Sequence, residues 1–264
     1  MVAHVQHRRD WRRNSKRSPP RRRRTHAGVW THEEAKAGEI RQLAASACGA
    51  TAVATVIRML LTHPPAPEAV LAAATLRVRA NDAPLPQYLA SRAVAGCTLA
   101  ECISSVERVC PGELSGVFLP GRGFSSANAL LERLAELLRT PGTAVICELN
   151  LQLLGNDAWH NQAVYGVDTE RCLVFCTNPL SEYAADAFFA LVTTPSVLRV
   201  RREDVLARRG RPGGDEAVLQ QPAWRELRVA EQLAALDGDP AATHVVIPAV
   251  YEGGLAVISR VAAQ

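Results

Sequence analysis

The segment from Ala44 to Leu61 constrains the fold most, because it has the length of a helix and almost no polar side. Every residue between Cys48 and Ile57 is small or apolar. A helix that is apolar all round has to be buried. His63-Pro64-Pro65 ends it, since proline cannot continue the backbone hydrogen bonding of a helix. We therefore expect one central helix enclosed by the rest of the chain.

The hydrophobic periodicity changes from helical to strand-like near residue 140. Helices are expected over residues 68–76, 85–95, 99–110 and 127–139, with Ser125 or Ser126 as the cap of the last. We expect one early strand over residues 116–119 and the end of a later helix over residues 188–193. Further strands are expected over residues 143–149, 162–167, 172–177 and 197–201. Residues 244–251 and 255–261 are expected to close the sheet as a hairpin. The pattern predicts an α+β fold with the central helix packed on an antiparallel sheet, a helical half over about 40–140 and a sheet half over about 141–264.

The charge of the chain is divided unevenly. Residues 1–26 hold ten of the 30 Lys and Arg but one of the 26 Asp and Glu, which leaves 20 basic against 25 acidic residues elsewhere. We expect residues 1–28 to be a disordered basic arm and residues 29–264 to be the folded domain. Such an arm is typical of a nuclear-localisation or polyanion-binding tail, and equally of a solvated extension without a partner.

The seven cysteines show no pairing pattern, and no apolar stretch follows the basic N-terminus. These features favour free thiols in a reducing compartment, the cytoplasm or the nucleus, and no membrane span. We expect no cofactor. A zinc site at Cys172, Cys176 and His160 is excluded, because the two cysteines would lie about 13 Å apart on one strand.

Cys48 is a candidate nucleophile because it stands near the start of the buried helix. Free N–H groups and the positive end of the dipole at that position favour a thiolate. Gly49 removes a side chain where a substrate carbonyl would approach. The amide of Gln42, in the loop before the helix, is placed to donate to an oxyanion beside the Cys48 N–H. The alternative is that Cys48 is an ordinary small apolar residue in an Ala-rich helix.

His160 is the expected base for this thiol. It opens a strand whose hairpin, with its loop at residues 168–171, places it opposite residue 179 and next to Asn178. Asn178 would then orient the imidazole, as the third member of a triad does. His63 lies at the wrong end of the helix, whereas His244, which also starts a strand, remains a rival base.

Gln42, Cys48-Gly49, His160 and Asn178 in this order resemble the papain-like cysteine peptidases. The hairpin that ends in Asn178-Pro179 is similar to the branch that contains bacteriocin-processing peptidases. The resemblance implies a papain-like fold and hydrolysis of a peptide or protein substrate, as a peptidase or an amidase, through a thioester on Cys48.

A weaker resemblance concerns the basic immunoglobulin-like variable motif-containing proteins. It is carried by residues 42–49, by Leu89–Cys97 and by the segment from Pro195 to Val205. Proteins of that family also have basic N-terminal segments and are associated with nucleus and cytoplasm. The alternative to an enzyme is therefore a catalytically inactive papain-like scaffold whose basic arm directs it to the nucleus or to nucleic acid.

Overall fold

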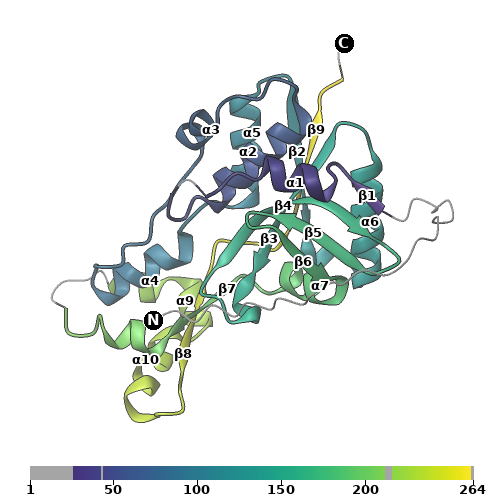
Figure 1. The fold of residues 1–264 in the computed structure, drawn as a ribbon. Helices are drawn as coiled ribbons and strands as arrows, with labels where there is room; N and C mark the ends of the chain where they lie inside the picture. The colour runs from purple at the N-terminus through teal and green to yellow at the C-terminus, as the bar shows by residue number, and fades with distance from the viewer. Residues whose placement is uncertain (1–25, 43, 212–215, 263–264) are drawn as a thin grey trace, which may run out of the picture.

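A computed structural model describes residues 26–42, 44–211 and 216–262, and these form a mixed α+β structure (Figure 1). Within the described residues, the larger sheet has seven strands, all paired antiparallel, in the order β2-β9-β3-β4-β5-β6, with β1 paired to the far end of β4. The strands are β1 (His26–Gly28), β2 (Leu114–Pro120), β3 (Thr143–Asn150), β4 (Trp159–Asp168), β5 (Leu173–Thr177), β6 (Ser181–Ala184) and β9 (Gly254–Arg260). The predicted α+β class is confirmed.

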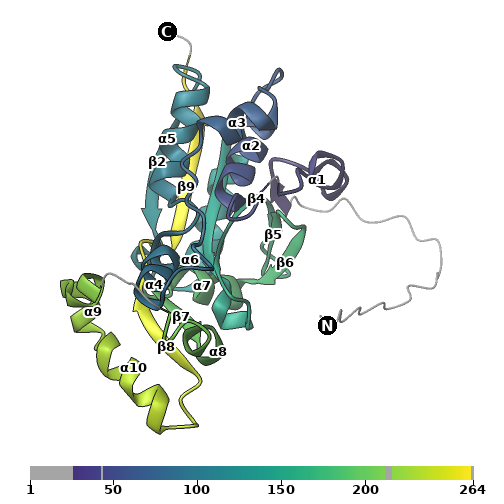
Figure 2. The same cartoon turned by 90° about the vertical axis from the view of Figure 1, so that its left-hand side faces the viewer.

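Helices cover both faces of this sheet (Figure 2). On one face lie α2 (Cys48–Leu60), α3 (Pro67–Ala73) and α5 (Leu99–Val109), and on the other lie α6 (Ala127–Arg139) and α7 (Ala185–Thr193). Strand β3 is buried along its whole length because its side chains alternate between the two layers. Ile146 packs with α2 and α5, whereas Val145 and Cys147 pack with α6 and α7. The apolar helix α2 is thus enclosed, as its sequence predicts.

A smaller lobe lies beyond one end of the sheet (Figure 1). It contains α4 (Leu85–Val94), a two-stranded sheet of β7 (Val197–Arg201) and β8 (His244–Pro248), and the helices α8 (Arg202–Leu206), α9 (Pro222–Glu226) and α10 (Val229–Gly238). Its core includes Trp159 and Tyr251, whose stacked rings lie 5.7 Å apart. The remaining elements are α1 (His32–Gly38) and the short 3-10 helices η1 (Gly121–Gly123), η2 (Leu151–Leu154) and η3 (Glu216–Gln220).

Most predicted elements are present within a few residues of their expected bounds. Helix α6 and strand β7 have the predicted limits, and the Ser126 hydroxyl caps α6 by accepting from the Ala129 N–H. Helix α2 begins at Cys48, four residues later than expected. The later start puts Cys48 in the first turn, where backbone N–H groups have no partner within the helix.

The predicted closing hairpin is wrong. Strand β8 pairs with β7 in the small sheet, and β9 lies between β2 and β3 in the large one. The linking chain passes so close to other backbone that a Cβ on Gly253 would lie 2.3 Å from the Val192 carbonyl oxygen. A Cβ on Gly254, where φ is +156°, would lie 2.4 Å from the Leu119 oxygen. The two glycines therefore carry the chain from one sheet to the other instead of forming a turn.

The described residues include only the end of the expected basic arm. Residues 1–25 of the predicted basic arm lie outside the described residues, but His26–Gly28 already belong to the sheet as β1. The expected halves interleave, because β2 pairs with β9 and α4 packs in the small lobe with β7 and β8. No helix in the described part of the chain combines the length and the apolar character needed to cross a membrane.

Candidate active site

Cys48 is the first residue of α2 and is half-buried in a cavity of about 310 Å³ between the main sheet and the small lobe. The chain enters the helix through Ser46, whose φ of +59° is unusual for a residue other than glycine. Backbone N–H groups of Asn161 and Gly49 interact with the sulfur. These donors and the N-terminal end of the helix all favour negative charge on the sulfur.

His160, the second residue of β4, lies beside Cys48. Its Nε2 is 2.5 Å from the backbone carbonyl oxygen of Asn178. Since a carbonyl can only accept, Nε2 carries a proton, and Nδ1 is left for the hydrogen bond that joins the ring to the Cys48 thiol. The structure thus brings Cys48 and His160 together, and their roles as nucleophile and base stay a prediction.

Each member of the pair shifts the pKa of the other. Burial alone would raise the pKa of the Cys48 thiol, but the hydrogen bond and the positive charge of His160, with the two backbone N–H groups, hold it below its ordinary value. Burial would likewise lower the pKa of His160, but the bonds to Cys48 and the Asn178 carbonyl raise it. Opposite shifts of this kind favour a thiolate–imidazolium pair at neutral pH.

Asn178 contacts His160 in a different way from the one expected. The observed hairpin loop is one residue later, at residues 169–172, and the register shifts again between Val164 and Gly166. Strand β5 ends at Thr177, and Asn178 has a φ of +68°. Its carbonyl therefore bonds to the imidazole, whereas its side-chain Nδ2 donates to the carbonyl oxygens of Cys48 at 3.3 Å and Asn161 at 3.4 Å. The Asn178 side chain therefore links β4 to α2, and the backbone carbonyl of Asn178 orients the imidazole ring of His160.

Gln162 is a positioning residue that we did not predict. Its Nε2 donates to the carbonyl oxygens of Asn178 at 3.2 Å and Pro179 at 3.0 Å, and to the Ser181 hydroxyl at 3.1 Å. The Tyr183 hydroxyl donates to its Oε1 at 2.8 Å. Gln162 thus holds the turn whose carbonyl orients His160. Its spacing of two from His160, on the same face of a strand, is the signal that could have revealed it.

Gln42 lines the same cavity as Cys48 and His160 and is exposed. Its side-chain Nε2 donates to the Ala44 carbonyl oxygen at 2.9 Å. The amide carries two N–H bonds, so one donor is used within the loop and the second is available to the cavity. Its predicted role at an oxyanion stays a prediction.

The structure shows a packing reason for Gly49, and its predicted role in substrate approach stays a prediction. A Cβ at this position would point inward and lie 2.1 Å from the sulfur of Cys97, 3.1 Å from that of Cys102 and 3.2 Å from Nδ2 of Asn161. A glycine is needed here because Cys97 packs against the first turn of α2.

Gly49→Ala is expected to lower the free energy of unfolding by about 1–3 kcal/mol, the usual cost of an overpacked core. Urea denaturation of the two proteins measures the difference. Combining Gly49→Ala with Cys97→Ala, which removes the clashing sulfur, should be less destabilising than the sum of the two single changes. Additive losses would show that the close contact does not determine the choice of glycine.

Glu148, on β3, is a buried acid behind Cys48 that sequence reasoning missed. Its side chain is 1% exposed and faces the α2 layer, opposite Asn161 on β4. Neither carboxyl oxygen makes a hydrogen bond of normal geometry within the described residues. Burial, followed by the negative charges that Cys97 and Cys48 can carry, raises the pKa of Glu148 well above its ordinary value, and the nearby Glu252 N–H offsets this in part. Burial therefore favours the neutral form of this carboxyl.

The other candidates lie elsewhere. His63 is exposed beyond the C-terminal end of α2, and His244 is exposed on β8 of the small sheet, outside the Cys48 cavity. Cys172 is an exposed thiol in the β4–β5 turn, and Cys176 is buried beside Cys147. Among the described residues no group of three or more His, Cys, Asp or Glu side chains is arranged to hold a metal ion.

No protein-family model matches the chain. A search of curated proteins likewise finds no similar sequence. The functional interpretation therefore rests on the residues around Cys48.

Proposed function

We propose that the chain is a cysteine-dependent hydrolase, a peptidase or an amidase of the papain-like kind, with Cys48 as nucleophile and His160 as its acid–base partner. The observation that carries the proposal is the hydrogen-bonded Cys48–His160 pair at the start of a buried helix, in an open cavity, with opposite pKa shifts. Perturbed titratable groups of this kind gather at active sites. The resemblance in Gln42, Cys48-Gly49, His160 and Asn178 supports the same reaction class.

The reaction proceeds in two steps. The Cys48 thiolate attacks the substrate carbonyl and forms a C–S bond, while the Cys48 N–H and the Gln42 amide stabilise the oxyanion. The imidazolium of His160 protonates the amine as the C–N bond breaks and leaves a thioester. A water molecule then gives a proton to neutral His160 and attacks the thioester, which releases the acid and restores the pair.

An activated ester tests this mechanism without knowledge of the natural substrate. We expect p-nitrophenyl acetate to give a burst of p-nitrophenolate of about one equivalent per chain, because acylation of an activated thiol outpaces thioester hydrolysis. Peptide mass mapping should place the acetyl group on Cys48. Cys48→Ala should abolish both the burst and the acetylation.

Cys172→Ala is the matched control, since Cys172 is an exposed thiol outside the site; it should leave the burst intact. Acetylation of Cys172 at least as fast as that of Cys48 would contradict the proposal. A burst without later turnover would favour the inactive-scaffold alternative, because deacylation requires His160 to activate water.

A further inference from the structure

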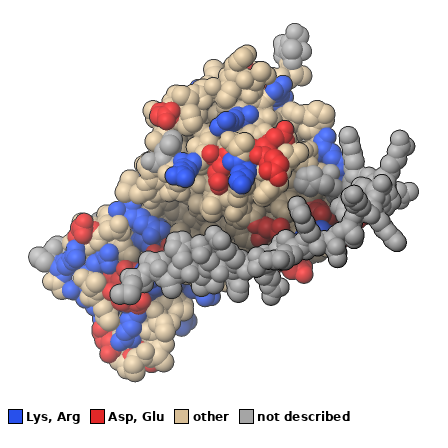
Figure 3. All heavy atoms as spheres, viewed as in Figure 1, with Lys and Arg blue, Asp and Glu red and all other residues tan. Residues whose placement is uncertain are grey.

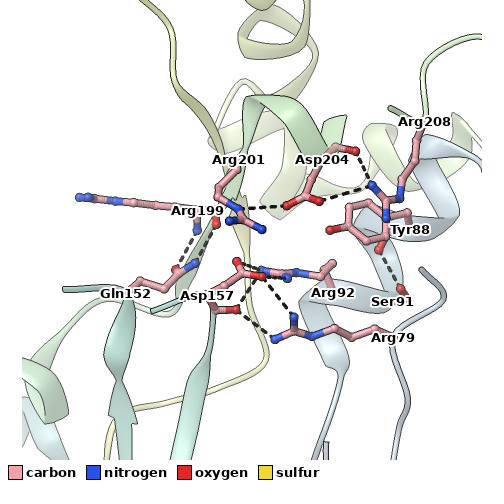
Figure 4. A network of polar contacts seen from close by, with 10 residues as sticks. All are labelled: Arg79, Tyr88, Ser91, Arg92, Gln152, Asp157, Arg199, Arg201, Asp204 and Arg208. Atoms are coloured by element: carbon pink, nitrogen blue, oxygen red, sulfur yellow. Dashed lines mark hydrogen bonds and ion pairs between the residues drawn. The ribbon is translucent and has the colours of Figure 1, made fainter. Parts of the chain in front are cut away.

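Two arginines meet a single carboxylate at the edge of the Cys48 cavity (Figure 4). Arg92, on α4, is bidentate to Asp157, with Nη1 2.7 Å from Oδ2 and Nη2 2.8 Å from Oδ1. Arg79, in the segment between α3 and α4, shares Oδ2 at 3.3 Å and donates to the Asp157 carbonyl oxygen at 3.0 Å. The three groups together carry one uncompensated positive charge.

The surplus charge belongs mainly to Arg79. Arg92 is 2% exposed and occupies both carboxylate oxygens at short distance, whereas Arg79 is 29% exposed and shares one oxygen at a longer distance. Burial alone would raise the pKa of Asp157, but the bonds and charge of Arg92, with the charge of Arg79, hold it below its ordinary value, so this acid stays ionised. Arg79 retains guanidinium N–H groups that can bind a second anion.

Arg79 also lines the two cavities onto which His160 opens. It lines the cavity that contains Cys48, and together with His160 it lines a neighbouring cavity of about 520 Å³. Its backbone is held in place two residues earlier, where Arg77 and Gly96 exchange N–H···O bonds of 3.2 and 2.7 Å. The guanidinium, bonded to Asp157, is therefore held at the wall of both cavities before any ligand arrives.

A second carboxylate, Asp204, also meets two arginines, but neither of them lines the Cys48 cavity. Asp204 pairs with both Arg201 and Arg208 (Figure 4), and Arg201 is more than half exposed. On the uncovered part of the face in Figure 3, acidic and basic side chains are intermixed over both the main body and the small lobe. The Arg79 charge is thus a local feature of the cavity wall.

We propose that the acyl donor for Cys48 carries a carboxylate that binds Arg79, either an acidic side chain near the scissile bond or the C-terminal carboxylate of a peptide. The planar guanidinium matches a carboxylate in a forked hydrogen-bond geometry. A surplus of one positive charge suits a monoanion and not a phosphate group with nearly two negative charges. This inference rests on the proposed role of Cys48 as nucleophile.

Two alkylating agents that differ in charge test the proposal at Cys48 itself. Iodoacetate carries the carboxylate that iodoacetamide lacks, and both modify thiolates. We expect Arg79→Gln to lower the ratio of the iodoacetate rate to the iodoacetamide rate at Cys48 about fivefold, the effect of one nearby charge at intermediate dielectric. Arg79→Lys should retain part of the ratio. Arg133→Gln, on α6 behind the opposite face of the sheet, should leave it unchanged.

Salt dependence in the unmodified protein provides a test that needs no variant. Raising the ionic strength should slow iodoacetate and leave iodoacetamide unaffected, because screening acts on the charged reagent. An unchanged ratio in Arg79→Gln, or an iodoacetate rate that does not depend on salt, would overturn the proposal. Rapid iodoacetamide labelling of Cys48 below pH 7 would still support Cys48 as the nucleophile in that case. Failure of the Arg79 proposal can therefore be distinguished from failure of the proposed function.

Short peptides that protect Cys48 from iodoacetamide identify the source of the carboxylate. Protection by an amidated peptide with Glu, but not by the same peptide with Gln, would assign an acidic side chain. Protection by a free-acid peptide without acidic residues, but not by its amide, would assign the C-terminus. Equal protection by charged and neutral peptides, or stronger protection by inorganic phosphate than by acetate, would contradict the proposal.

Discussion

His160→Ala is expected to slow the alkylation of Cys48 by iodoacetamide at pH 6 about a hundredfold. In the unmodified protein the hydrogen bond and charge of His160, with the backbone N–H groups of Asn161 and Gly49, outweigh burial and hold the pKa of the thiol below its ordinary value. Without His160, burial is the dominant influence, and we expect the pKa of the thiol to rise to its ordinary value or above it. Such a thiol is well under 1% thiolate at pH 6. The measurement is the second-order rate constant at Cys48 against pH.

The pKa shifts of Cys48 and His160 set the direction in which hydrolysis depends on pH. Because the pKa of Cys48 is lowered and that of His160 is raised, hydrolysis that needs the ion pair should rise above the first pKa and fall above the second. His244→Ala is the control, since His244 is exposed in the small sheet; it should leave the profile unchanged. A wild-type alkylation rate that rises only near pH 8.5 would show that the pair does not form.

Glu148→Gln is expected to stabilise the protein increasingly as the pH rises. Burial raises the pKa of Glu148 in the folded state well above its ordinary value. Between the unfolded and folded pKa values the folded chain retains a proton that the unfolded chain has released, so the wild type loses stability with rising pH. The loss is about 1.4 kcal/mol per pH unit over that interval for one group. The neutral glutamine removes this dependence.

Urea denaturation at several pH values from about 4 upward measures the effect, since the unperturbed pKa of Glu is near 4.3. The two proteins should be similar at the acid end and diverge as the pH increases. Glu132→Gln, at an exposed position on α6, should show no such divergence. A constant difference between wild type and Glu148→Gln would mean that the buried carboxyl is ionised and paired in the folded state.

The fold was predictable where local sequence patterns decide it. The bounds of α6, the cap at Ser126 and the burial of α2 follow from periodicity, capping residues and the apolar character of one segment. The partner of a strand is a long-range choice that such patterns do not contain. Strand β9 has the composition of a hairpin partner for β8, yet it inserts between β2 and β3 because Gly253 and Gly254 let the chain pass through a narrow gap.

The candidate site likewise has some features that the sequence predicts and others that only the tertiary structure decides. From the sequence alone, Cys48 was placed at a helix start and His160 with Asn178 beside one hairpin, because turn and helix signals are local. The tertiary structure decided that the Asn178 carbonyl orients the imidazole, since the exact register and the backbone angle at Asn178 set that contact. It also brought Arg92 to Asp157 across 65 residues of chain and enclosed Glu148 behind Cys48. Charged residues that are distant in sequence come together only through tertiary packing. The electrostatics of the site could therefore not be predicted from local sequence patterns.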